Sequence, residues 1–164
     1  MLQIQTGKSN KILRGKADPV KKIDASVKKL IKEMVKVMLE KNGVGLAAPQ
    51  VASSTRVIVA RMNVGTENEI IVSMINPEIV YFSDEKVECE EGCLSLPDLW
   101  GDVVRSKEII VRFLTEKASP MTLKLSDFNA KIIQHEVDHL DGVLFADKAK
   151  NLHKKKETEE TQAA

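Results

Sequence analysis

Two of the three histidines in this 164-residue sequence lie four positions apart, in the segment His135-Glu136-Val137-Asp138-His139. On an α-helix, residues four apart share a face, so both imidazoles can reach one metal ion. Glu136 lies beside them, where it can accept a proton from a water molecule that such an ion activates. The pattern therefore indicates a metal-dependent hydrolytic site of the HExxH type.

Two histidines do not complete such a site, because a catalytic metal needs three protein ligands and an open position for water. Downstream, the candidates are Asp141, Asp147 and His153. Asp141 lies too near on the same helix, and His153 lies in a weakly apolar tail. Upstream, Cys93 in the segment EEGCLSLP offers a thiolate, a soft ligand. The residues alone leave these candidates open.

Two rival sites would use some of the same residues. A closed structural zinc site would add Cys89 to Cys93 and the two histidines, and it would leave Glu136 without a role. A zincin-type metallopeptidase would combine the HExxH pair with a downstream ligand and cut internal peptide bonds. Replacement of Cys89 distinguishes the closed site from the open one, because only the closed site needs that sulfur.

Hydrophobic periodicity predicts two helices. The first runs from Asp24 to Lys41, with an apolar stripe along one side and Asp24 or Ser26 at its start. The second begins near Ser126 or Asp127, carries the HExxH pattern and ends at Gly142. Its apolar face continues into the two histidines, which places them toward the interior.

Between the helices, apolar runs predict strands at residues 56–60, 69–75, 78–82, 108–114 and 121–125. Asn76-Pro77 and Ser119-Pro120 are typical of turns. Residues 43–50, GVGLAAPQ, are predicted to form a tightly folded loop because they combine two glycines with a proline.

The composition excludes several classes of protein. Hydrophobic residues make up 43% of the chain, which is enough for the core of one domain, and the net charge of +1 argues against a protein that coats nucleic acid. Aromatic residues are only 4%, too few for a base-stacking platform. No apolar run has the length of a membrane span, and no secretory signal is recognisable. Two cysteines do not make a disulfide framework, so a reducing cytoplasm is expected.

Three segments resemble the sequence motifs of peptide deformylases, in the same order: GVGLAAPQ (43–50), EGCLS (91–95) and QHEVDHLDG (134–142). The resemblance spans Leu13 to Asp147. It implies a metal-dependent hydrolase that removes the formyl group from the N-terminal formylmethionine of nascent polypeptides and releases formate. With the order of predicted elements, it implies an α+β fold in which small antiparallel or mixed sheets pack around the HExxH helix. An N-terminal helix precedes this unit, and a helical or mobile tail follows it. Residues 1–147 would form a single catalytic domain and residues 148–164 a charged tail.

The resemblance also implies the ligands and the proton carrier. Cys93, His135 and His139 would bind one divalent ion, ferrous iron in most members, with zinc, nickel or cobalt as substitutes. Glu136 would serve first as base toward the attacking water and then as acid toward the leaving nitrogen.

Further roles follow from the resemblance in the same way. The side-chain amide of Gln50 and the backbone N–H of Leu94 would stabilise the oxyanion, and Gly45 would lie where the loop backbone approaches the substrate. The methionine side chain would occupy an apolar slot lined by Val44, Cys89 and Ile132.

Two positions depart from common family patterns. Trp100 lies where some members carry arginine, which bears on how residues beyond the methionine are held. Lys131 replaces an apolar residue near the slot, where its charge could polarise the mouth or its stem could extend to solvent. Asp138 is expected to support the ligands rather than to bind metal, with Arg105 as an ion-pair partner.

The expected partners are N-formylmethionyl nascent peptides and, further, the ribosome, with no membrane and no sequence-specific nucleic-acid binding. Lys154, Lys155 and Lys156 could touch ribosomal RNA, although the glutamates that follow make a solvated charge run the simpler interpretation. A catalytically inactive member that only binds nascent chains or ribosomes is a third alternative, against which the complete set of chemical residues argues. A bacterial-type cytoplasm is expected, with an organelle or phage origin as alternatives.

Overall fold

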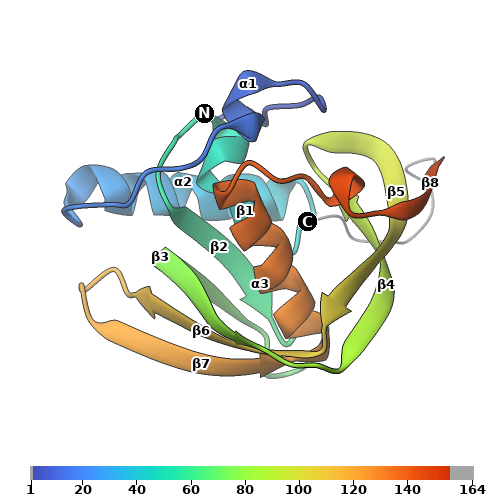
Figure 1. Ribbon diagram of the computed structural model, residues 1–164. Coiled ribbons are helices and arrows are strands. Elements are labelled where there is room, and N and C mark those ends of the chain that lie inside the picture. The colour runs from blue at the N-terminus through green and yellow to red at the C-terminus, as the bar shows by residue number, and fades with distance from the viewer. Residues whose placement is uncertain (1, 156–164) are drawn as a thin grey trace.

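Two antiparallel sheets and three helices make an α+β structure in the computed structural model, which describes residues 2–155 (Figure 1). The helices are α1 (Lys11–Arg14), α2 (Ala25–Glu40) and α3 (Asp127–Leu140), with 3-10 turns η1 (Ala48–Val51) and η2 (Phe145–Asp147). The strands are β1 (Gly45–Ala47), β2 (Val57–Met62), β3 (Ile70–Phe82), β4 (Lys86–Cys93), β5 (Leu96–Ser106), β6 (Glu108–Leu114), β7 (Pro120–Ser126) and β8 (Lys150–Lys154). The α+β prediction is confirmed. Within residues 2–155, no helix has the length and apolar character needed to cross a membrane.

The larger sheet has the strand order β1-β2-β3-β6-β7, and α3 packs against it (Figure 1). Ile132 and Ile133 of α3 join buried residues of the sheet, among them Ile58, Met74 and Val111, in one core cluster. The apolar side of α3 is therefore buried, and the histidines that continue this side are carried into the interior with it.

Helix α2 matches its prediction closely. The Asp24 carboxylate accepts hydrogen bonds from the backbone N–H groups of Ser26 and Val27, which identifies Asp24 as the N-cap. The buried side of α2 includes Met34 and Met38, which pack against β1 and β2. The opposite side of the helix faces solvent.

Two segments differ from their predictions. GVGLAAPQ is not an irregular loop, because Gly45–Ala47 pair with β2 and the next four residues form η1. Asn76-Pro77 is not a turn between two strands, because β3 runs without a break from Ile70 to Phe82. The register with β6 shifts there instead, and Asn76 adopts a left-handed conformation with φ of 52°. Its side chain bonds both the N–H and the carbonyl of Val20, so the irregularity is a bulge anchored to the N-terminal segment.

The smaller sheet, β4-β5-β8, is absent from the sequence prediction. β4 and β5 form a long hairpin that turns between Cys93 and Leu96, so the EGCLS segment lies at its tip. β8 pairs with β5, which corrects the expectation of a helical or mobile tail for these residues. Lys155, just after β8, contacts the Glu90 carboxylate and lies 5.0 Å from the centroid of the Trp100 ring system. These contacts stabilise a strand whose own side chains are exposed. Lys156 and the glutamates beyond it lie outside the described residues.

Candidate metal centre

Three metal-ligating side chains meet between the β4–β5 hairpin and α3. The Sγ of Cys93 and imidazole nitrogens of His135 and His139 lie within 4.8 Å of one another, and all three residues are buried. The Cys93 Sγ is 3.3 Å from the His139 Nε2. The structure thus brings together the three residues that the resemblance implied as ligands, one from the end of a strand and two from successive turns of a helix.

The surrounding atoms fit a divalent metal ion. Within residues 2–155, the His135 Nε2, the His139 Nδ1 and both Glu136 carboxylate oxygens are buried without a hydrogen-bond partner. Buried polar atoms rarely lack partners in proteins. One sulfur and two imidazoles make a donor set suited to iron, zinc, nickel or cobalt. The site can therefore hold a metal ion, and its ligand chemistry alone does not select one.

Burial also sets the protonation of the ligands. It lowers the pKa of His139 well below its ordinary value, so this imidazole is neutral and can donate a lone pair. Burial raises the pKa of the Cys93 thiol to about 12. A coordinated cation acts in the opposite direction, because a metal-bound thiol loses its proton. Metal binding at this sulfur is thus coupled to proton release.

A buried ion-pair network orients His135. Its Nδ1 is 2.9 Å from the Glu91 Oε2, which turns the Nε2 toward Cys93 and His139. Arg105 donates to both Glu91 oxygens at 2.7 and 2.9 Å and to Asp138 at 2.7 Å. Burial alone would raise the pKa of Glu91, but hydrogen bonds from Arg105 and His135 outweigh it and hold the pKa well below its ordinary value. The expected pair of Arg105 with Asp138 is confirmed.

Glu136 is fully buried beside the three ligands, against the backbone of β1. A Cβ built on Gly45 would come within 2.9 Å of the Glu136 Cγ, so only glycine allows this approach. Burial first, and the charge of Glu91 second, raise the pKa of Glu136 well above its ordinary value. The carboxyl is thus held in a dry environment, where its affinity for a proton is high.

Gln50 faces the same centre from η1. Its Oε1 accepts the backbone N–H of Ala47 at 2.9 Å, which fixes the orientation of the side-chain amide. Its Nε2 donates to the Ser95 Oγ at 3.1 Å and lies 3.6 Å from the Cys93 Sγ. Leu94, the other expected oxyanion donor, directly follows Cys93 and is half-buried. Both expected donors therefore lie beside the sulfur.

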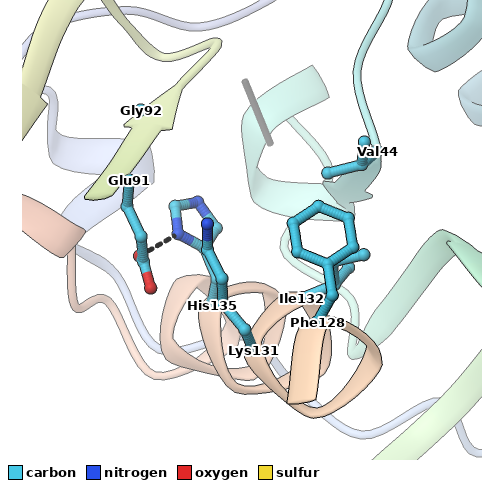
Figure 2. Close-up of a pocket in the computed structure, with 7 residues that line it drawn as sticks. All are labelled: Val44, Glu91, Gly92, Phe128, Lys131, Ile132 and His135. Atoms are coloured by element: carbon cyan, nitrogen blue, oxygen red, sulfur yellow. Dashed lines mark hydrogen bonds and ion pairs between the residues drawn. The ribbon is translucent and has the colours of Figure 1, made fainter. Parts of the chain in front are cut away.

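A pocket opens next to the metal centre (Figure 2). Its lining residues are Val44, Glu91, Gly92, Phe128, Lys131, Ile132 and His135. Figure 2 shows Val44, Phe128 and Ile132 together on one side, across from the hydrogen-bonded Glu91 and His135. The expected slot residues Val44 and Ile132 thus line it. Cys89 does not, since its thiol is directed at the Val103 carbonyl at 3.8 Å, and its part in substrate binding stays a prediction.

Sequence reasoning missed two features of this pocket. Phe128 lines the pocket, and its spacing of four from Ile132 on the same helix could have placed it on the slot wall. The role of Glu91 is the second, although a metal-binding histidine usually donates its second ring N–H to a carboxylate, carbonyl or water, and Glu91 lies two residues before Cys93.

The two positions that depart from the family pattern have definite surroundings. The Lys131 Nζ donates to the Glu90 carbonyl at 2.9 Å and lies 5.2 Å from the Phe128 ring centroid. The ammonium is therefore held at the pocket wall and does not extend freely into solvent. Trp100 is buried against Gly92, where an added Cβ would lie 2.8 Å from the ring.

Neither rival metal site is assembled in residues 2–155. Cys89 is not in the ligand cluster, so a Cys2His2 set is not formed. The downstream candidates all pair elsewhere: Asp141 with Arg56, Asp147 with Arg14, and His153 with Glu90. The open three-ligand arrangement is the one that the geometry supports.

Comparisons with known proteins agree with this geometry. The family model described as polypeptide deformylase matches residues 1–155. A peptide deformylase from Picosynechococcus is 42% identical over 142 residues, which are 87% of this chain and 76% of that protein. The crystal structure of the Thermotoga maritima enzyme is 39% identical, with a TM-score of 0.85, and the match covers 92% of this chain and 98% of that one.

A second solved structure comes from Synechococcus elongatus, a peptide deformylase in complex with actinonin. It is 35% identical, with a TM-score of 0.86, and the match covers 92% of this chain and 81% of that one. The chain therefore belongs to the polypeptide deformylase family, metal-dependent hydrolases that remove N-formyl groups.

Proposed function

We propose that Cys93, His135 and His139 hold a divalent ion, ferrous iron in the cell, and that the site hydrolyses the formamide of N-formylmethionyl nascent peptides. The observation that carries this proposal is the buried cluster of three ligand atoms beside a carboxylate that has no other partner among residues 2–155. When bound, the ion supplies a Lewis acid that lowers the pKa of a water molecule.

Glu136 moves the proton in this reaction. Its carboxylate accepts a proton from the attacking water as the new bond forms to the formyl carbon. It then gives that proton to the nitrogen as the carbon–nitrogen bond breaks, so that formate and a free amine leave. The dry surroundings that raise its pKa favour both steps, because they bring the proton affinity of the carboxylate closer to that of water and amine groups.

The negative charge that develops on the formyl oxygen needs preorganised donors. The Gln50 Nε2 is held toward the centre by the bond from Ala47 to its carbonyl oxygen, so little reorganisation is needed when it donates. The backbone N–H of Leu94 serves as the second donor. Gly45 lets the substrate chain approach the β1 backbone, and Val44, Cys89 and Ile132 receive the methionine side chain.

Three broader assignments belong to the same proposal. Residues 1–147 form the catalytic domain, and residues 148–164 form a charged tail whose first part is β8. The enzyme works in the cytoplasm of a bacterial-type cell. Its substrates reach it at the ribosome, where formylated N-termini emerge.

The test is formate release from formyl-Met-Ala-Ser by protein purified without oxygen, with the metal content measured in the same sample. Ferrous iron and a thiolate both oxidise readily, so anaerobic handling is needed. We expect about one metal per chain, and a loss of about 10²- to 10⁴-fold in kcat for Glu136→Gln with metal retained. Metal-loaded protein that releases no formate would overturn the proposal.

A further inference from the structure

The net charge of +1 conceals a strong separation of charge along the chain. Residues 1–41 contain eleven lysines and arginines against four aspartates and glutamates, a net charge of +7. Residues 42–164 contain fourteen against twenty, a net charge of −6. The small net charge of the whole chain therefore does not exclude nucleic-acid binding by the N-terminal part, where basic residues cluster.

Six lysines concentrate this charge on and just before α2. We define the α2 basic face as Lys21, Lys22, Lys28, Lys29, Lys32 and Lys36, all of which are exposed. Lys28, Lys32 and Lys36 follow one another at intervals of four, so they form an inclined row on one side of the helix, with a rise of about 6 Å per step. Lys36 lies 3.7 Å from Glu40, and the other five form no ion pair with residues 2–155.

This arrangement does not serve the stability of the helix. Like charges four residues apart repel each other, as Lys28 with Lys32 and Lys32 with Lys36 do here. Apart from the N-cap Asp24, the N-terminal end of α2 has no acidic residue in its first turn, and the lysines gather toward this end, where the helix dipole disfavours positive charge. A charge pattern that opposes both effects is better explained by a negatively charged partner than by folding.

The surroundings of the face indicate what kind of partner it fits. The apolar side of α2, with Ile31, Met34 and Met38, is buried in the core and cannot insert into a lipid surface. Leu39 is the one large apolar residue of α2 that is exposed, so the face also lacks the apolar centre of a typical protein interface. The row combines Lys28 and Lys32, which have no ion-pair partner among residues 2–155, with Lys36, which lies beside Glu40. Such a row of ammonium groups suits the phosphates of a nucleic acid, which a protein can bind without contacts to the bases.

We propose that the α2 basic face is a docking surface for the phosphate backbone of RNA. The choice of RNA among phosphate polymers rests on the proposed function, because nascent polypeptides emerge from a particle built largely of RNA. In Figure 1, the N-terminal part of α2 lies at the left of the molecule and the β4–β5 hairpin at the right, so docking on that part of α2 leaves the hairpin, which carries Cys93, uncovered. At the other end of the described chain, Lys155 is already paired with Glu90.

The test measures binding of the metal-loaded full chain to a fluorescent RNA hairpin at increasing salt. In the α2 triple variant, Lys28→Gln, Lys32→Gln and Lys36→Gln remove three charges from the row. The matched control replaces Lys117, Lys124 and Lys150, which are exposed and lie outside α2, with glutamine. Each backbone contact contributes about 0.9 to the slope of log affinity against log salt, so the α2 triple variant should lose about 2 to 3 from that slope. Its affinity at low salt should fall more than about tenfold.

The control variant should keep the slope and affinity of the unsubstituted protein. A variant with arginine at Lys28, Lys32 and Lys36 keeps the three positive charges, so it should bind RNA as tightly as the unsubstituted protein. All variants should release formate at the same rate, so that failure of docking and failure of catalysis are distinguishable. Equal losses in the α2 triple variant and the control would overturn the proposal. An unchanged slope in the α2 triple variant would overturn it as well, and so would tighter binding to phosphatidylserine vesicles than to RNA.

Discussion

Replacement of Arg105 should destabilise the protein far more than replacement of an arginine in an exposed ion pair. Arg105→Met removes a guanidinium whose side chain is 4% exposed and which bonds Glu91 at 2.7 and 2.9 Å. The Glu91 side chain is 1% exposed and, among the residues that the structure describes, keeps only the His135 side chain as a partner. Removal of one member of a buried pair costs about 3–5 kcal/mol in the free energy of unfolding, because the other charge stays buried.

Arg112→Met is the matched control. Arg112 pairs with Glu78 at 3.0 Å, but these side chains are 61% and 67% exposed. Such a pair contributes about 0–1 kcal/mol. Urea unfolding of the metal-loaded proteins at neutral pH measures both losses under the same conditions. Equal losses, or a loss below about 1 kcal/mol for Arg105→Met, would refute the view that this network is a buried support for the metal centre.

The same network predicts a dependence on pH. In the folded protein, the bonds from Arg105 and His135 hold the pKa of Glu91 below the ordinary 4.5. A carboxylate with a lowered pKa stabilises the fold above its unfolded pKa, and this stabilisation is lost as the pH falls. Below about pH 4.5, the unfolding free energy of the metal-free protein should therefore fall more steeply than that of Arg105→Met. A steeper fall in the variant would contradict this assignment.

Three further substitutions test the walls of the site. Gly45→Ala should keep its metal but lower kcat about 100-fold, because the added methyl group displaces the Glu136 side chain. Unchanged formate release would contradict the close approach of Glu136 to Gly45. Lys131→Leu should lower the ratio of kcat/KM for a formyl-Met-Asp peptide to that for a formyl-Met-Lys peptide about fivefold, because the substitution removes one positive charge from the pocket wall. The same ratio in the variant and the unsubstituted protein would place the ammonium away from bound substrate. Cys89→Ser should retain its metal, because Cys89 lies outside the ligand cluster, and loss of metal on dialysis would revive the closed zinc site.

The elements that carry a local signal were predictable from the sequence. α2 has an apolar stripe and Asp24 as its N-cap. α3 begins at Asp127, where the sequence indicates a helix start, and its histidines continue a buried apolar face. His135 and His139 on α3 were predictable as a ligand pair for the same reason, because the sequence alone gives the spacing of residues within one helix.

The parts that depend on pairing between distant segments were not predictable. β4 contains three glutamates among its eight residues and its burial increases only toward Cys93, so it lacks the apolar alternation of a typical strand. β8 is exposed along its length and is held by contacts such as that of Lys155 with Glu90. Asn76-Pro77 has the local composition of a turn. Its role as a bulge depends on bonds to Val20, which is far away in sequence, so the local pattern could not indicate it.

X-ray absorption spectroscopy of the metal-loaded protein examines the ligand set itself. One sulfur and two imidazole nitrogens, completed by light oxygen scatterers, are expected for an open site built from Cys93, His135 and His139. Two sulfur ligands would assign the metal to a closed site that includes Cys89, and the absence of any sulfur would remove Cys93 from the centre.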